Sequence, residues 1–81
     1  MTEIENRIYL ILVALSALPM EEIAPTSSLS LDLDLDSLEL ADLAQIIEDE
    51  FALRVADEEM ERVQTVEQLC ELVEEKVSAA K

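Results

Sequence analysis

Residues 32–40 read DLDLDSLEL, and this stretch marks the point where a loop gives way to a helix. Acids stand at alternate positions up to Asp36, a serine follows, and amphipathic spacing begins directly behind it. Asp36 can cap the helix, and Glu39 stands where a capping box has its second member. The hydroxyl of Ser37 is then left on the first turn, beside unpaired backbone N–H groups that favour a phosphate. The stretch therefore predicts a modified serine at a helix start.

The helix that follows is predicted to run from Ser37 to about Phe51, with two well-separated faces. The inner face is apolar and comprises Leu40, Leu43, Ala44, Ile47 and Phe51. The outer face is mostly acidic or polar and comprises Leu38, Ala41, Asp42, Gln45, Glu48 and Asp49. An acidic face alone is usually just solvated. The leucine at its head, directly beside Ser37, argues against a merely solvated surface.

Helical spacing also appears on both sides of this segment. A capping box of Thr2 and Glu5 begins a first helix that reaches about residue 15. A short helix is expected over residues 57–62, and a second box of Thr65 and Gln68 begins a last helix that continues to near the end. The fold class predicted is all-α, a small bundle of three main helices and one short helix.

A long loop is predicted between the first two helices, over residues 16–35. Pro19, Pro25 and a run of Thr and Ser argue against helix there. Apolar residues are nevertheless spaced through it, and we expect three of them to anchor the loop on the bundle: Ile23, Leu29 and Leu33.

The composition leaves little room for an enzyme. The chain has 81 residues, which suits one domain spanning 1–81, and a chain this small buries only about 60% of its unfolded surface. It has no His, Gly or Trp, so the usual general base and every glycine-rich phosphate loop are missing. Its one cysteine, Cys70, lies in an apolar stripe and is expected to be a buried small side chain. We expect a non-catalytic protein without a metal site.

The charge balance is strongly acidic. The chain has 20 Asp and Glu residues against 5 Lys and Arg residues, a formal charge of −15, and no base lies between Arg7 and Arg54. Such a surface repels nucleic acid and anionic membranes and attracts basic protein patches. No stretch reads as a signal peptide or membrane span, and a lone cysteine permits no internal disulfide. A cytoplasmic monomer with basic protein partners is expected.

Several motifs together resemble the acyl carrier protein family over essentially the whole chain. Asp36-Ser37-Leu38 matches the family's Asp-Ser-Leu attachment motif at the start of its second helix. Residues 48–51, Glu-Asp-Glu-Phe, look like the acidic end of that helix, and residues 57–59, Asp-Glu-Glu, look like the opening of the family's third helix.

Some positions depart from the family's pattern. Asp34 stands where glycine is usual, in a chain without any glycine. Leu31 and Leu35 add apolar groups to a loop that is commonly more polar, and Gln45 occupies a position that is often apolar.

The resemblance implies that Ser37 receives 4′-phosphopantetheine from coenzyme A through a phosphopantetheinyl transferase. The thiol of this group would carry acyl groups as thioesters in fatty acid, polyketide or specialised lipid biosynthesis. The partners implied are acyl-transferring and synthase enzymes with basic docking patches. The residues implied to meet them are Asp36, Leu38, Ala41, Asp42, Gln45, Glu48 and Asp49.

The resemblance also implies that the acyl chain shelters between the helices. The residues that would line this pocket are Leu43, Ala44, Ile47, Met60, Val63 and Leu69. From the residues alone, an ordinary, fully packed core is equally possible.

Other interpretations of the chain differ in cargo or in class. A carrier of aminoacyl, peptidyl or D-alanyl groups shares the fold and the serine, and an acidic interaction or inhibitor protein explains the charge but not the placement of Ser37. Asp32, Asp34 and Asp36 imitate the start of a calcium-binding loop. That loop requires glycine and glutamate where this chain has Ser37 and Leu43, so its bidentate ligand is missing.

Overall fold

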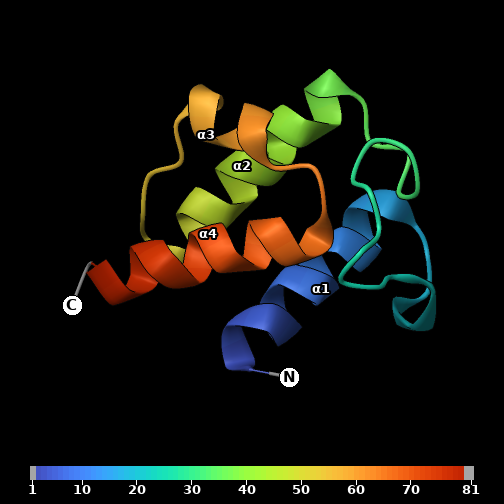
Figure 1. Cartoon of the computed structure of the whole chain (residues 1–81), viewed down its shortest axis with the longest axis horizontal. Helices are drawn as coiled ribbons and strands as arrows, with labels where there is room; N and C mark the ends of the chain where they lie inside the picture. Colours follow the sequence, from blue (N-terminus) through green and yellow to red (C-terminus); the bar gives the residue numbers. More distant parts are fainter. Residues whose placement is uncertain (1, 80–81) are drawn as a thin grey trace.

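The computed structural model describes residues 2–79, and it is all-helical, as predicted (Figure 1). Three long helices and one short helix follow one another, with a single 3₁₀ turn, η1 (Met20–Glu22), inside the long loop. The helices are α1 (Glu3–Ser16), α2 (Ser37–Phe51), α3 (Asp57–Arg62) and α4 (Val66–Ala79). The predicted bounds of the helices are confirmed, whereas η1 has no counterpart in the sequence-based prediction.

The outer helices begin at the predicted capping boxes. At α1, the Glu5 N–H donates to Thr2 Oγ1 at 3.1 Å and the Thr2 N–H donates to Glu5 Oε1 at 3.0 Å. At α4, the Gln68 N–H donates to Thr65 Oγ1 at 3.2 Å and the Thr65 N–H donates to Gln68 Oε1 at 3.1 Å. Each box satisfies N–H groups that have no partner inside the helix, which stabilises the first turn.

The core lies where α1 meets α2 and α4 (Figure 1). Each of these helices contributes fully buried aliphatic side chains. The side chains at 0% exposure are Ile8 and Leu12 of α1, Leu43 and Ile47 of α2, and Val66, Leu69 and Val73 of α4. Burying each large aliphatic side chain contributes about 1.5–3 kcal/mol, so this shared core holds the three long helices together.

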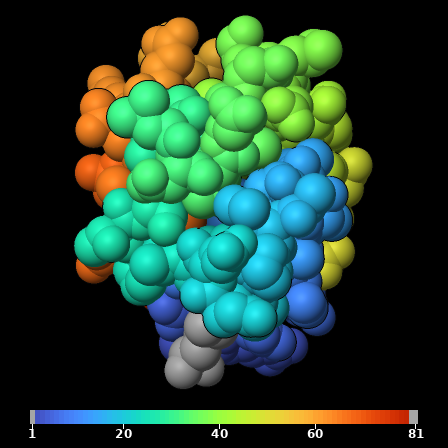
Figure 2. Space-filling model, turned by 90° about the vertical axis from the view of Figure 1, so that its right-hand side faces the viewer, coloured from blue at the N-terminus to red at the C-terminus, as the bar shows by residue number. Residues whose placement is uncertain are grey.

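The long loop packs against one end of the bundle and spreads over it in Figure 2. The predicted anchors Ile23, Leu29 and Leu33 are exposed by only 5%, 1% and 3%, which confirms their role. Backbone bonds tie the loop to the start of α4: the Leu29 N–H donates to the Gln64 oxygen at 2.9 Å, and the Val66 N–H donates to the Ser27 oxygen at 3.0 Å. The loop is therefore an ordered part of the fold.

The short helix α3 is fixed by side chains from both neighbouring helices. Glu48 of α2 accepts a hydrogen bond from the Val55 N–H at 2.8 Å, just ahead of α3. Lys76 of α4 lies with its Nζ 2.8 Å from Oε1 of Glu59 in α3. These two contacts position α3 beside the first half of α2, where the candidate site lies.

Candidate functional site

The start of α2 has the capping box predicted from the sequence. The Glu39 N–H donates to Asp36 Oδ1 at 2.8 Å, and the Asp36 N–H donates to Glu39 Oε1 at 3.3 Å. Because both side chains are used by the backbone, the first turn is held in one geometry. Ser37, the first helical residue, is exposed on that turn.

Ser37 lies at the edge of a hollow between α2 and α3, which we call the first cleft. Its volume is about 320 Å³. Its lining is apolar towards the inside and acidic at the rim, and consists of Ser37, Leu40, Ala41, Ala44, Asp57, Met60 and Glu61. A group attached to the hydroxyl therefore begins beside an apolar surface.

The electrostatics at Ser37 suit a phosphate on its oxygen. The capping box occupies the N–H of Glu39, which leaves the Ser37 and Leu38 amides on the first turn without an acceptor inside the helix. These amides and the positive end of the dipole of a 15-residue helix favour an anion. Asp36 and Glu39 repel it, but the site faces water, which screens that repulsion.

The predicted outer face of α2 is present as a single surface. Leu38 is 71% exposed, and Ala41, Asp42, Gln45 and Asp49 are also exposed along the helix. Glu48 differs because it is half-buried and its carboxylate accepts the Val55 N–H. The structure thus assigns Glu48 to the turn between α2 and α3, a role that depends on a tertiary contact and was missed from the sequence.

The predicted pocket residues fall into two groups. Ala44 and Met60 line the first cleft, and Val63 lines a neighbouring one. The other three, Leu43, Ile47 and Leu69, are 0% exposed in the packed core. The residues of the first group are accessible to a ligand in this structure. The residues of the second group could contact a ligand only if the packed helices moved apart.

The neighbouring hollow, which we call the second cleft, lies between the long loop and the end of α3. Its volume is about 520 Å³, and Leu31 and Val63 are among its lining residues. It shares three residues with the first cleft: Leu40, Met60 and Glu61. The two clefts therefore adjoin, so that Leu31 and Ser37 belong to one continuous region of the surface.

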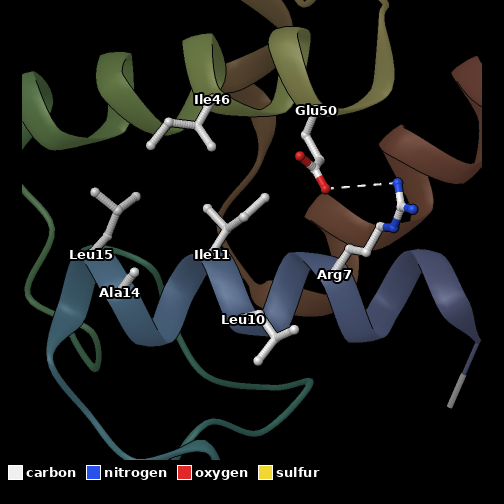
Figure 3. A pocket seen from close by; sticks show the side chains of 7 residues that line it. All are labelled: Arg7, Leu10, Ile11, Ala14, Leu15, Ile46 and Glu50. Carbon is white, nitrogen blue, oxygen red and sulfur yellow. Dashed lines mark ion pairs between the residues drawn. The ribbon is translucent and has the colours of Figure 1, made fainter.

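A third hollow, between α1 and α2, contains none of the predicted site residues. Its volume is about 340 Å³, and Ile11, Leu15 and Ile46 point into the space between the two helices (Figure 3). At one end Arg7 forms an ion pair with Glu50 at 3.7 Å.

Two of the three alternating acids before Ser37 accept hydrogen bonds from the backbone. Asp32 Oδ2 accepts the Ser28 N–H at 2.6 Å, and Asp36 caps α2. Asp34, at the position where the family usually has glycine, has a φ of 56°, in the left-handed region that glycine adopts most easily. Across residues 2–79 no group of three or more His, Cys, Asp or Glu side chains is placed to hold a metal ion.

Cys70 lies inside the core, 4% exposed, as predicted for a small apolar side chain. Burial, with the nearby carboxylates adding to it, raises the pKa of the Cys70 thiol to about 12. The thiolate is therefore scarce at neutral pH, and Cys70 supplies no nucleophile.

Sequence reasoning did not include Leu40, Asp57 and Glu61 in the site, although all three line the first cleft. The position of Leu40 could have been predicted from the sequence, since it falls on the apolar inner face of α2. The positions of Asp57 and Glu61 could not have been predicted, because they depend on how α3 packs.

Within residues 2–79, no helix has the length and apolar character needed to cross a bilayer.

The known proteins similar to this chain include several acyl carrier proteins. Residues 6–73 match the family described as "Phosphopantetheine attachment site". Curated relatives include the acyl carrier protein of Petrotoga mobilis, 37% identical over 94% of this chain and 89% of that protein. Another is the acyl carrier protein of Chlorobium phaeovibrioides, 34% identical over 91% of this chain and 95% of that protein. A solved structure, the acyl carrier protein of Thermotoga maritima, matches with a TM-score of 0.78 at 25% identity, covering 98% of this chain and 96% of that one.

Proposed function

The chain belongs to the acyl carrier protein family, and we propose that Ser37 is its attachment point for the 4′-phosphopantetheine that members of the family bind covalently. It is a carrier protein for acyl groups. The observation that carries the proposal is the position of Ser37: an exposed hydroxyl on the first turn of a capped helix, at the edge of an apolar cleft.

The residues around Ser37 fit this group. In the attachment reaction, the Ser37 oxygen bonds to the coenzyme A phosphorus that carries pantetheine. The pyrophosphate bond from this phosphorus to adenosine 3′,5′-bisphosphate breaks, and the serine proton leaves with that product. The free amides of the first turn favour the resulting phosphodiester. When bound, the group supplies a thiol on a flexible arm, which holds acyl groups as thioesters. Ser37 itself is then only an anchor, and the chain catalyses no step.

The partners we propose are a phosphopantetheinyl transferase and the acyl-transferring and synthase enzymes of fatty acid or related biosynthesis. They meet the outer face of α2, where Leu38 offers apolar contact and Asp42 and Asp49 offer charge to basic residues. Exposed ion pairs contribute about 1 kcal/mol or less each, so docking is fast and reversible. A carrier that visits several enzymes requires both properties.

The first cleft suggests where an attached acyl chain begins its path into the protein. Ala44 and Met60 line this cleft, and Leu43 and Ile47 lie deeper on the same helix. We propose that an acyl chain enters between α2 and α3 and reaches the core residues by moving these helices apart.

The carrier works as a single domain and a monomer in the cytoplasm.

The proposal is tested by incubating the purified chain with a broad-specificity phosphopantetheinyl transferase and either coenzyme A or an acyl-coenzyme A. Intact mass is expected to rise by one phosphopantetheine in the first case and by one acyl-phosphopantetheine in the second. If several such transferases leave the mass unchanged, the carrier function is wrong for this chain.

A further inference from the structure

Leu31 is the most exposed large apolar side chain described in this protein, at 85%. It belongs to a series of leucines at alternate positions in the long loop. Its neighbours in that series, Leu29, Leu33 and Leu35, are exposed by only 1%, 3% and 2%. A single exposed leucine is common on protein surfaces, so the importance of Leu31 depends on how the loop holds it and on what surrounds it.

The exposure of Leu31 is built into the loop. Ser28 organises the turn: its backbone oxygen accepts the N–H groups of Asp32 and Leu33, each at 3.0 Å, and its hydroxyl accepts the Leu31 N–H at 3.1 Å. The Asp32 carboxylate closes the turn by accepting the Ser28 N–H at 2.6 Å. The backbone of Leu31 is thus held in place, and ordering it on contact with a partner costs little entropy.

A second exposed leucine stands on the other side of the attachment serine. Leu38 follows Ser37 directly and is 71% exposed. Leu31 lines the second cleft, which shares Leu40, Met60 and Glu61 with the first cleft at Ser37. Leu31 and Ser37 therefore lie on one continuous region of the surface, and Leu38 follows Ser37 on the first turn of α2.

The surroundings of this pair are acidic. Asp32, Asp34 and Asp36 are exposed along the loop between the leucines, and Glu61 lies on the rim shared by the two clefts. No base lies between Arg7 and Arg54 in the sequence. A matching surface must offer apolar hollows for the leucines and positive charge for the acids around them.

Building on the proposed function, we infer that Leu31 is a second apolar anchor, acting with Leu38, for enzymes that dock over Ser37. The partner surface it fits has an apolar hollow ringed by lysine or arginine. Leu31 thereby extends the docking surface from α2 onto the long loop. It also restricts partners, because an enzyme with a charged residue at that point would bury it against leucine.

The test is the steady-state kinetics of modification by a phosphopantetheinyl transferase with coenzyme A, since this enzyme must dock over Ser37. For Leu31→Ser we expect the KM for the carrier to rise about tenfold, the factor that corresponds to about 1.4 kcal/mol, with kcat within about twofold of wild type. Leu31→Met, which keeps an apolar side chain, should restore a KM close to that of wild type.

The matched control is Leu10→Ser, because Leu10 is also exposed, at 54%, but lines the separate hollow between α1 and α2. It should leave KM unchanged, and circular dichroism should show that every variant folds. If Leu31→Ser has the KM of wild type, the inference is overturned. That result is also expected if Leu31 covers the protein's own acyl chain. Failure of the carrier function is a different outcome, in which wild type itself is never modified.

Discussion

Lys76 Nζ lies 2.8 Å from Glu59 Oε1, and this ion pair joins the short helix α3 to the last helix α4. The same carboxylate accepts the Ala56 N–H at 2.9 Å ahead of α3. The hydrogen bond from Lys76, and then the one from Ala56, lower the pKa of Glu59 below its ordinary value of 4.5. Since α3 lines both clefts, this contact helps to hold one of their walls in place.

The first prediction concerns acid pH. A carboxyl group whose pKa is lowered by folding stabilises the folded state fully above its unfolded value of 4.5. That contribution is lost as pH falls below 4.5, because the unfolded chain takes up the proton first. Wild type should therefore be more stable than Glu59→Gln at pH 7, and the difference in the free energy of unfolding should disappear at strongly acid pH. A difference independent of pH in urea titrations would contradict this assignment.

The second prediction concerns the cap of α2. Asp36→Ala removes the acceptor for the Glu39 N–H and should lower the free energy of unfolding by about 1 kcal/mol, as measured by urea unfolding. Asp36→Asn keeps an oxygen acceptor and should lose much less. If both variants are equally destabilised, the capping role is wrong. The Asn variant removes the negative charge of Asp36 but keeps the capping oxygen, so it distinguishes an effect of the charge from an effect of the cap.

The third prediction concerns the thiol of Cys70. Because burial raises its pKa to about 12, Cys70 should not react with a disulfide reagent at pH 8 in the folded protein, and it should react readily in concentrated urea. The variant Cys70→Ala provides the blank. Equal reaction rates in the folded and unfolded states would show that the thiol is accessible.

The fourth prediction concerns the acidic face of α2. Asp42→Lys should slow phosphopantetheinyl transfer several-fold at low salt, because charges around a docking site steer association. The effect should fade at high salt, where the Debye length is short. Glu71→Lys makes the same change of charge at an exposed position on α4 and serves as control. If both variants are slowed equally, net charge alone is responsible and the docking face is not.

Much of this fold could be predicted because its signals are local. The capping pairs Thr2 with Glu5 and Asp36 with Glu39 are three residues apart, so the starts of α1 and α2 could be read directly. The anchors Ile23, Leu29 and Leu33 were predicted from apolar residues spaced through an otherwise polar loop.

The remaining features depend on contacts between distant residues. The bond from Val55 to Glu48 and the ion pair of Lys76 with Glu59 arise only when the helices pack. The first of them gives Glu48 a structural role that the sequence does not predict. The outward direction of Leu31 could not be predicted either, because its neighbours at alternate positions are buried and only the turn built by Ser28 breaks the pattern.

The central claim is that Ser37 holds the phosphopantetheine, and mapping the modified residue by peptide mass spectrometry tests it most directly. After incubation with coenzyme A and a phosphopantetheinyl transferase, wild type should carry one added group on the peptide that contains Ser37. Ser30→Ala, which removes an exposed hydroxyl from the nearby loop, should be modified like wild type. Ser37→Ala should take up nothing, and a Ser37→Ala protein that still gains the group would contradict the account.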